Sequence, residues 1–238
     1  MSDANSDTNV DELIQKYLRD AAKGSVTAMR KLADIYYSGP YGSPDYDKAV
    51  FWYEKASSNN DADAANKLAY FYLEGEGVAK DTKRAKELFE IAAESKNSAA
   101  MNNLGLMYRE GLGCKKNIDL AIDWFEKAIR SGNDFAIFNL GVLYVDIGKI
   151  DEALQLFKQA IDRKNANAMV FLAAMYYTGK GVEKDLRKAL EYFDMAAQLD
   201  NVDGLNSAAY MYERGEGGEQ NKIKAAAYRK KVRQIKQV

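Results

Sequence analysis

Histidine is absent from the 238 residues of this chain, and cysteine occurs once, as Cys114. Without an imidazole there is no Ser–His or Cys–His pair for nucleophilic catalysis and no histidine ligand for a metal. The single thiol has no partner for a disulfide and no neighbouring base that would activate it, which favours a structural role. We therefore expect a protein that is not an enzyme and that carries no metal and no cofactor.

Long apolar runs, proline and an excess of charge of one sign are also missing. No run of about 18 apolar residues could span a bilayer, and no basic-then-apolar leader occurs, so we expect a cytoplasmic protein without a membrane contact. The two prolines, Pro40 and Pro44, leave the rest of the chain free for uninterrupted helices. A net charge of −1 gives no electrostatic reason for binding nucleic acid.

The chain does contain one pattern that occurs six times. Each copy begins with a small residue, has Leu (Ala in the last copy) four residues later, then a second small residue, and a tyrosine at offset 8 from the start. The copies start at Ala28, Ala64, Ala100, Ala136, Ala168 and Gly204. The steps between them are 36, 36, 36, 32 and 36 residues. Such a period is typical of a solenoid, whose units bury their apolar faces by stacking.

Within each copy the spacing predicts two helices joined by a glycine turn. Offsets 0, 4, 5 and 8 fall on one side of a helix with about 3.6 residues per turn. A second stripe, such as Ala85, Phe89 and Ala92, predicts the second helix. A glycine such as Gly75 suits the left-handed end of the first helix, and Asp81 suits the N-cap of the second. We expect thirteen helices, no sheet, and the six tyrosines buried between repeats.

These residues resemble the Sel-1-like repeat, a relative of the tetratricopeptide repeat. The third copy shows the motif in residues 100–113 (AMNNLGLMYREGLG) and 121–128 (AIDWFEKA). The resemblance runs from about residue 27 to residue 233. It implies an all-α fold, a right-handed α/α superhelical solenoid of about six helix-turn-helix repeats with terminal capping helices. The fourth copy departs from the motif, because its loop, residues 145–151, is four residues shorter and like that of a tetratricopeptide repeat.

Both ends of the array are expected to differ from the repeats. Residues 1–10 are small, polar and acidic, which predicts a disordered tail. Residues 11–23 have the spacing of a second helix without its first, which predicts an N-terminal capping helix before the repeats of residues 24–221. Residues 222–238 carry seven basic side chains and no acid. Because a terminal unit needs a polar outer face, we interpret them as a basic C-terminal capping helix.

The helix face opposite the core lines the concave surface of tetratricopeptide-like stacks, and the resemblance implies the same here. In the fourth copy this face is apolar, which predicts an exposed anchor for a partner, since contiguous apolar surface usually marks binding. The predicted anchor comprises Phe135, Phe138, Val142 and Val145, extended by Leu106, Val170 and Tyr177. The alternative is that tight curvature of the superhelix buries Phe135 and Phe138 against adjacent repeats.

Two polar sets share this face. Five amides fall at offsets 2 and 3: Asn66, Asn102, Asn103, Asn139 and Asn206. A side-chain amide both donates and accepts, so this ladder could hold an extended peptide backbone, or it could simply fill a solvated face. A short acidic rank at offset 10 comprises Glu74, Glu110 and Asp146. It would favour a basic partner, although such charges commonly form a solvated rim.

These observations predict an adaptor or scaffold that captures a protein or peptide on its concave face. An immunity-type protein that neutralises a folded toxin or effector would use the same surface, and this alternative stays open. A β-lactam-binding hydrolase, as among cysteine-rich members of the family, is a further alternative. The absence of the cysteines that those relatives carry weighs against it.

Overall fold

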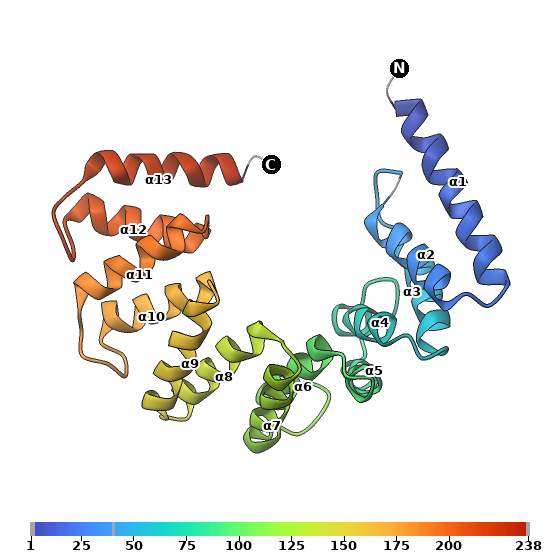
Figure 1. Cartoon of the computed structure of the whole chain (residues 1–238), viewed down its shortest axis with the longest axis horizontal. Coiled ribbons are helices and arrows are strands. Elements are labelled where there is room, and N and C mark those ends of the chain that lie inside the picture. The colour runs from blue at the N-terminus through green and yellow to red at the C-terminus, as the bar shows by residue number, and fades with distance from the viewer. Residues whose placement is uncertain (1–2, 40, 237–238) are drawn as a thin grey trace. The chain divides into compact units, whose positions relative to one another are not determined.

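The computed structural model describes residues 3–39 and 41–236, with the backbone alone for residues 3–9, and its regular structure is α-helical (Figure 1). The helices are α1 (Asp3–Ala22), α2 (Val26–Ser38), α3 (Tyr46–Ser57), α4 (Ala62–Glu74), α5 (Thr82–Glu94), α6 (Ser98–Glu110), α7 (Ile118–Arg130), α8 (Asp134–Asp146), α9 (Ile150–Asp162), α10 (Ala166–Thr178), α11 (Leu186–Gln198), α12 (Val202–Arg214) and α13 (Lys222–Ile235). The described residues contain no strand, so the prediction of thirteen helices without a sheet is confirmed.

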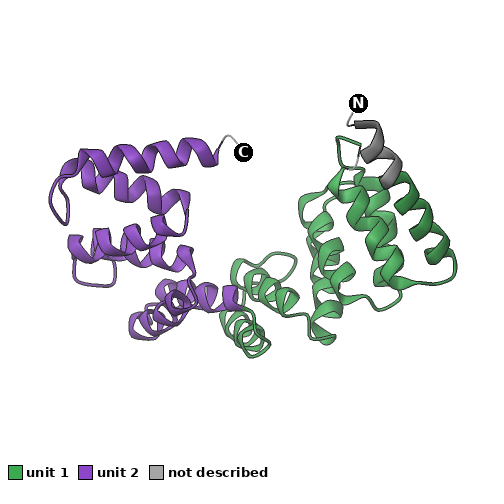
Figure 2. Cartoon of the chain, turned by 45° about the horizontal axis from the view of Figure 1, so that its top comes forward, with its two compact units in different colours: residues 1–133 green, residues 134–238 purple. Residues whose placement is uncertain are grey.

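The chain divides into two compact units, residues 1–133 (unit 1) and residues 134–238 (unit 2), coloured separately in Figure 2. Within unit 1 each helix from α1 to α7 packs against the next, and within unit 2 the same holds from α8 to α13. Each unit is therefore a stack of helix pairs, as expected of a repeat solenoid. The division falls at the start of the short fourth copy.

The core of each repeat forms where a large ring of the second helix meets a small residue of the first. At Gly141 in α8 a Cβ atom would lie only 2.7 Å from the ring of Phe157 in α9. Phe157 is fully buried, as are Tyr53, Phe89 and Phe125 at the same position in other second helices. The small residue at offset 5 is thus required because the two helices approach closely there.

The tyrosines at offset 8 do not occupy this core, and the prediction that they are buried is wrong. All six are half-buried. A basic side chain covers some of the rings: the Lys48 Nζ atom lies 5.1 Å from the centroid of the Tyr36 ring. The polar tip reaches a charged partner where one is available, as the Tyr72 hydroxyl donates to Glu54 Oε1 at 3.0 Å. Because tyrosine joins an apolar ring to a polar tip, it suits the wet edge of the helix interface.

The glycine turns have two functions, of which the sequence predicted one. Gly111 ends α6 in the left-handed conformation, with φ of 78°, as expected. At Gly113 a Cβ atom would lie 2.2 Å from the carbonyl oxygen of Thr82, the first residue of α5 in the preceding repeat. The first glycine of the turn therefore ends a helix, whereas the second allows the loop to pack on the previous repeat. Asp81 caps α5 by accepting from the N–H groups of two following residues, each at 3.0 Å.

The terminal helices cover the ends of the two units. In unit 1, α1 packs on α2 and buries Ile14 and Ala21. In unit 2, α13 packs on α12 and is held by Lys224, whose Nζ donates to Asp194 Oδ2 at 3.0 Å and to the Tyr212 hydroxyl at 2.7 Å. The predicted tail of residues 1–10 overlaps α1 from Asp3 onward. Residues 1, 2, 237 and 238 lie outside the described chain, so the exact division of the ends stays a prediction.

Candidate protein-binding surface

The apolar stripe predicted in α8 is not one exposed surface. It consists of Phe135, Phe138, Val142 and Val145. Phe135 is 68% exposed and Val145 is 8% exposed, whereas the two side chains between them are half-buried. The centroid of the Phe138 ring lies 6.2 Å from that of Phe157 in α9 and 6.0 Å from that of Phe171 in α10. Because α10 brings the ring of Phe171 against it, Phe138 belongs to an aromatic cluster, and Phe135 remains as the exposed residue.

The three side chains expected to extend this stripe are also half-buried. Leu106 lies on α6 in unit 1. Val170 and Tyr177 lie on α10 in unit 2, where they pack against the buried cluster around Phe193. The hydroxyl of Tyr177 donates a hydrogen bond to Oε2 of Glu216 at 2.9 Å.

The asparagine ladder is largely engaged inside the protein. Asn103 is buried, its Nδ2 donates to Asn66 Oδ1 at 3.2 Å, and its Oδ1 accepts from the Tyr70 hydroxyl at 3.0 Å. Asn102 is buried as well. The other two amides, Asn139 and Asn206, are half-buried and exposed respectively. At this junction the side chain at offset 3 of one repeat is hydrogen-bonded to the side chains at offsets 2 and 6 of the previous repeat. The amide of Asn103 is therefore used within the protein and is not available to a partner.

The acidic rank lies in the last turn of three first helices. Glu74, Glu110 and Asp146 are all exposed. Glu110 is near its own neighbour, with Oε1 3.3 Å from Nε of Arg109. Glu74 lines a pocket that is a candidate binding site.

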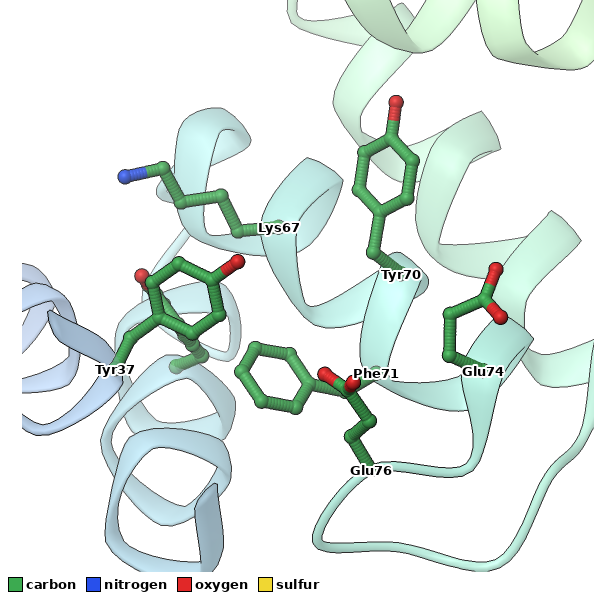
Figure 3. A pocket seen from close by; sticks show the side chains of 7 residues that line it. Tyr37, Lys67, Tyr70, Phe71, Glu74 and Glu76 are labelled. Carbon is green, nitrogen blue, oxygen red and sulfur yellow. The ribbon is translucent and has the colours of Figure 1, made fainter. Parts of the chain in front are cut away.

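The pocket lies between α2 and α4 in unit 1 and has a volume of about 440 Å³ (Figure 3). It is lined by Tyr37, Tyr53, Lys67, Tyr70, Phe71, Glu74 and Glu76. Its floor includes Tyr53, which is 1% exposed and whose hydroxyl donates to Asp34 Oδ1 at 2.7 Å. Burial, together with this bond to Asp34, raises the pKa of Tyr53. The rings of Tyr37 and Tyr70 remain exposed at its walls.

The charges of the α2–α4 pocket are unbalanced. Nζ of Lys67 donates to Asp34 Oδ1 at 2.6 Å, so this cation is already paired. Glu74 and Glu76 are exposed, and neither forms an ion pair with any of the residues that the structure describes. Two carboxylates beside exposed aromatic rings make a site that attracts a cation.

A second pocket, of about 320 Å³, lies between α10 and α12 in unit 2. It is lined by Ala174, Tyr177, Thr178, Phe193, Asn206, Ser207, Tyr210 and Met211. Five of these residues lie 140 positions after a residue of the α2–α4 pocket, which places them at the same repeat offsets. The pairs are Tyr37 and Tyr177, Tyr53 and Phe193, Lys67 and Ser207, Tyr70 and Tyr210, and Phe71 and Met211. The chain thus carries two equivalent pockets, one in each unit.

The acid next to the α10–α12 pocket, Glu216, contacts the lining residue Tyr177 and is paired within the chain. Glu216, the equivalent of Glu76, accepts from Nε of Arg214 at 2.8 Å and from the Tyr177 hydroxyl at 2.9 Å. These bonds, that of Arg214 first, lower the pKa of Glu216. The guanidinium carbon of Arg214 lies 5.3 Å from the centroid of the Tyr210 ring. At the position of Arg214 the other pocket has Glu74, and this single difference reverses the charge beside the ring.

Three residues of these pockets, Tyr177, Asn206 and Glu74, were predicted from the sequence to bind a partner, whereas most of the others were not. The aromatic and charged lining residues that were not predicted include Tyr37, Lys67, Tyr70, Glu76 and Tyr210. A usable signal was present: an aromatic residue at offset 9 of one copy, followed by Tyr at offset 6 and Glu at offset 12 of the next. Only the first and fifth junctions between copies show it.

The remaining chemistry of the described residues is sparse. They contain no group of three or more His, Cys, Asp or Glu side chains that could hold a metal ion. Cys114 is half-buried, its Sγ donates to the carbonyl oxygen of Met107 at 3.7 Å, and burial raises the pKa of the thiol. None of the helices described above is both long and apolar enough to cross a membrane.

Two repeat families match the sequence. The Sel1 repeat matches residues 26–61, 62–97, 98–133, 166–201 and 202–231. The tetratricopeptide repeat matches residues 136–167, which is the short fourth copy. No curated protein matches the chain.

Solved structures resemble the chain over most of its length. A protective antigen of uropathogenic Escherichia coli with an SLR fold is 28% identical, with a TM-score of 0.70 over 92% of this chain and 48% of its own. The chain thus spans about half the length of that antigen. A Sel1 repeat protein from Oxalobacter formigenes is 24% identical, with a TM-score of 0.77 over 89% of this chain and 86% of its own. An immunity protein from Pseudomonas aeruginosa is 25% identical, with a TM-score of 0.59 over 87% of this chain and 82% of its own.

Proposed function

The chain belongs to the Sel1 repeat family, and from this premise we propose that it is an adaptor that holds a polypeptide partner against the first helices of its repeats. Sel1 repeats typically mediate contacts between proteins and generally form non-catalytic scaffolds. The observation that carries the proposal is the recurrence of one pocket, with the same aromatic positions, in both units.

The walls of the two pockets have the chemistry of a protein-binding site. Tyr70 and Tyr210 are each 45% exposed, and each lines its pocket. Concave, mostly apolar surfaces with a few polar groups are the usual ligand sites of proteins. Tyrosine is also among the residues enriched where binding energy concentrates, and truncating such a residue commonly costs about 2 kcal/mol or more.

A pair of matched variants tests the proposal. The double variant Tyr70→Ser, Tyr210→Ser removes one ring from each pocket, and Phe51→Ser removes a ring of similar exposure, 47%, from a second helix, α3. When the tagged chain is purified from its native host, a partner should co-purify with it. We expect the double variant to lose this partner and the Phe51→Ser variant to keep it. Equal retention by both variants, with helical content unchanged by circular dichroism, would contradict the proposal.

Immunity-type binding of a folded toxin is the second candidate. The likeness to the Pseudomonas aeruginosa immunity protein favours it. A folded toxin would need an interface of at least about 1,000 Å², whereas a peptide could bind through the pockets alone. Hydrogen exchange of the complex distinguishes the two, because protection confined to the amides around the pockets indicates a peptide and protection across several loops indicates a folded domain.

Absence of catalysis and a cytoplasmic location are further parts of the proposal. Cys114 supports the first, because its thiol is half-buried and its pKa is raised rather than lowered. We expect no turnover of nitrocefin by the purified protein, and measurable hydrolysis would revive the β-lactam alternative. Fractionation of host cells tests the location.

A further inference from the structure

We propose that the α2–α4 pocket binds the guanidinium group of an arginine of the partner, whereas beside the α10–α12 pocket Glu216 and the ring of Tyr210 already hold Arg214 of the chain itself. The inference rests on the proposed function, because it assumes that a polypeptide lies on the face made by the first helices. It commits the first pocket to one chemical class of side chain.

The α10–α12 pocket supplies an internal precedent for this mode of binding. Arg214 donates from Nε to Glu216 at 2.8 Å, and its guanidinium carbon lies 5.3 Å from the centroid of the Tyr210 ring. One planar cation is thus held by a carboxylate on one side and an aromatic face on the other. Both contacts are of the kind that arginine makes better than lysine, because its fork is flat and weakly hydrated.

The α2–α4 pocket has the same acceptors without the cation. Tyr70 corresponds to Tyr210 and is equally exposed, and Glu76 corresponds to Glu216. The position of Arg214 is taken by Glu74, so the internal cation is replaced by a second carboxylate. A guanidinium from outside would therefore find the aromatic face of Tyr70 and two acceptors, which matches its several donors.

The other charge in the α2–α4 pocket does not cancel these acids. Lys67 lies on the side of α4 that faces α2, where its ammonium group is bonded to Asp34 at 2.6 Å. In Figure 3 the carboxylate of Glu76, on the loop after α4, overlaps the side chain of Phe71, on the side of its ring away from Tyr37. An arginine entering here would place its methylene groups against aromatic surface while its head meets the carboxylates.

Short peptides provide the probe. We choose Ac-Ala-Ala-Arg-Ala-Ala-NH₂, the same peptide with citrulline, which keeps the shape and removes the charge, and the same peptide with leucine. Binding is followed by NMR titration of the ¹⁵N-labelled full chain, whose backbone amides report on each pocket separately. We expect the arginine peptide to shift the amides of Tyr70, Glu74 and Glu76 at millimolar concentration. We expect the citrulline peptide to bind about two- to fivefold more weakly, as for the loss of an exposed ion pair.

Two reciprocal variants test the role of the differing position. Glu74→Arg should pair with Glu76 as Arg214 pairs with Glu216, and should abolish binding at the α2–α4 pocket. Arg214→Glu should create a second binding site, reported by the amides of Tyr210 and Glu216. Glu110→Gln removes the exposed acid at the same offset of the third copy and serves as the control, with no expected change. Raised salt should weaken the arginine peptide more than the leucine peptide.

Four results would each overturn the inference: no shift with the arginine peptide, equal binding of the citrulline peptide, tighter binding of the leucine peptide, or shifts that persist in Glu74→Arg. These failures are separate from failure of the proposed function, which is tested by the double variant Tyr70→Ser, Tyr210→Ser against the native partner. If the double variant loses the partner while citrulline and arginine peptides bind equally, the face binds polypeptides but the pocket is not specific for a cation.

Discussion

Replacing Phe138 by alanine tests whether this side chain stabilises unit 2 or serves as an anchor for a partner. The sequence placed it on the exposed arc of its helix, yet its ring packs on those of Phe157 and Phe171. Phe135 lies one turn earlier on α8, is 68% exposed, and has no ring contact among the described residues. The pair Phe138→Ala and Phe135→Ala therefore removes the same atoms from two different environments.

The expected difference follows from burial. Truncation of a fully buried phenylalanine to alanine costs about 3–5 kcal/mol. Because Phe138 is half-buried, about half of that cost applies, and each lost ring contact adds up to about 1 kcal/mol. We expect a loss of about 2–3 kcal/mol in the free energy of unfolding for Phe138→Ala, and about 0.5 kcal/mol or less for Phe135→Ala.

Urea unfolding followed by far-ultraviolet circular dichroism measures both variants. Long repeat arrays depart from two-state unfolding, so the midpoint of the transition is compared, with the slope reported beside it. Trp52 and Trp124 both lie in unit 1, and their fluorescence gives an internal reference for the unit that carries no substitution. Coincident midpoints for the two variants would refute the placement of Phe138 in the core and restore it as an exposed anchor.

Three further predictions concern the loops, the thiol and the C-terminal helix. Gly113→Ala should lower the free energy of unfolding by more than about 2 kcal/mol, because its Cβ would lie 2.2 Å from a backbone oxygen. Gly132→Ala, at a φ of 85° with no atom within 4 Å of the new Cβ, should lower it by about 1 kcal/mol. Thermal unfolding of the two variants measures the difference. Cys114→Ser should leave stability and partner binding intact. Because burial raises the pKa of the Cys114 thiol, iodoacetamide should alkylate it more slowly than free cysteine near neutral pH, and the rate should rise as the pH is increased. Asp194→Ala removes the acceptor of Lys224 and should speed hydrogen exchange throughout α13, while α10 stays protected; unchanged exchange in α13 would contradict this anchoring role.

The repeat period was sufficient to predict the helices and the core. Residues at offsets 0, 4 and 5, such as Leu32 and Ala33, are fixed by packing between neighbouring helices, and they are fully buried. The same logic failed at offset 8, because a tyrosine there needs only its ring covered. Local periodicity reports which side of a helix faces the stack, and it does not report how far a long side chain extends past the edge.

The candidate site was harder to predict because it depends on pairs of side chains from successive copies. Asn103 was expected to be available to a partner, but its amide lies within reach of Asn66 and Tyr70 of the previous copy. Val145 was assigned to the exposed arc, and it is covered in the stack. The partners of Asn103 lie more than 30 residues before it in the sequence, so a projection of its own helix does not contain them.

Positions at the ends of the first helices are free to change because the core does not use them. Glu74 and Arg214 are both exposed, at the same offset, and exchange of such residues usually alters stability by about 0.5 kcal/mol or less. Stability therefore does not decide which residue stands there, whereas charge beside the aromatic ring does decide what the pocket accepts. A stack of nearly identical repeats can thus differ in recognition from one junction to the next, provided that the variation stays at offsets outside the packed stripe. The reciprocal variants Glu74→Arg and Arg214→Glu separate these two constraints directly, since they exchange the charges while leaving every buried position unchanged.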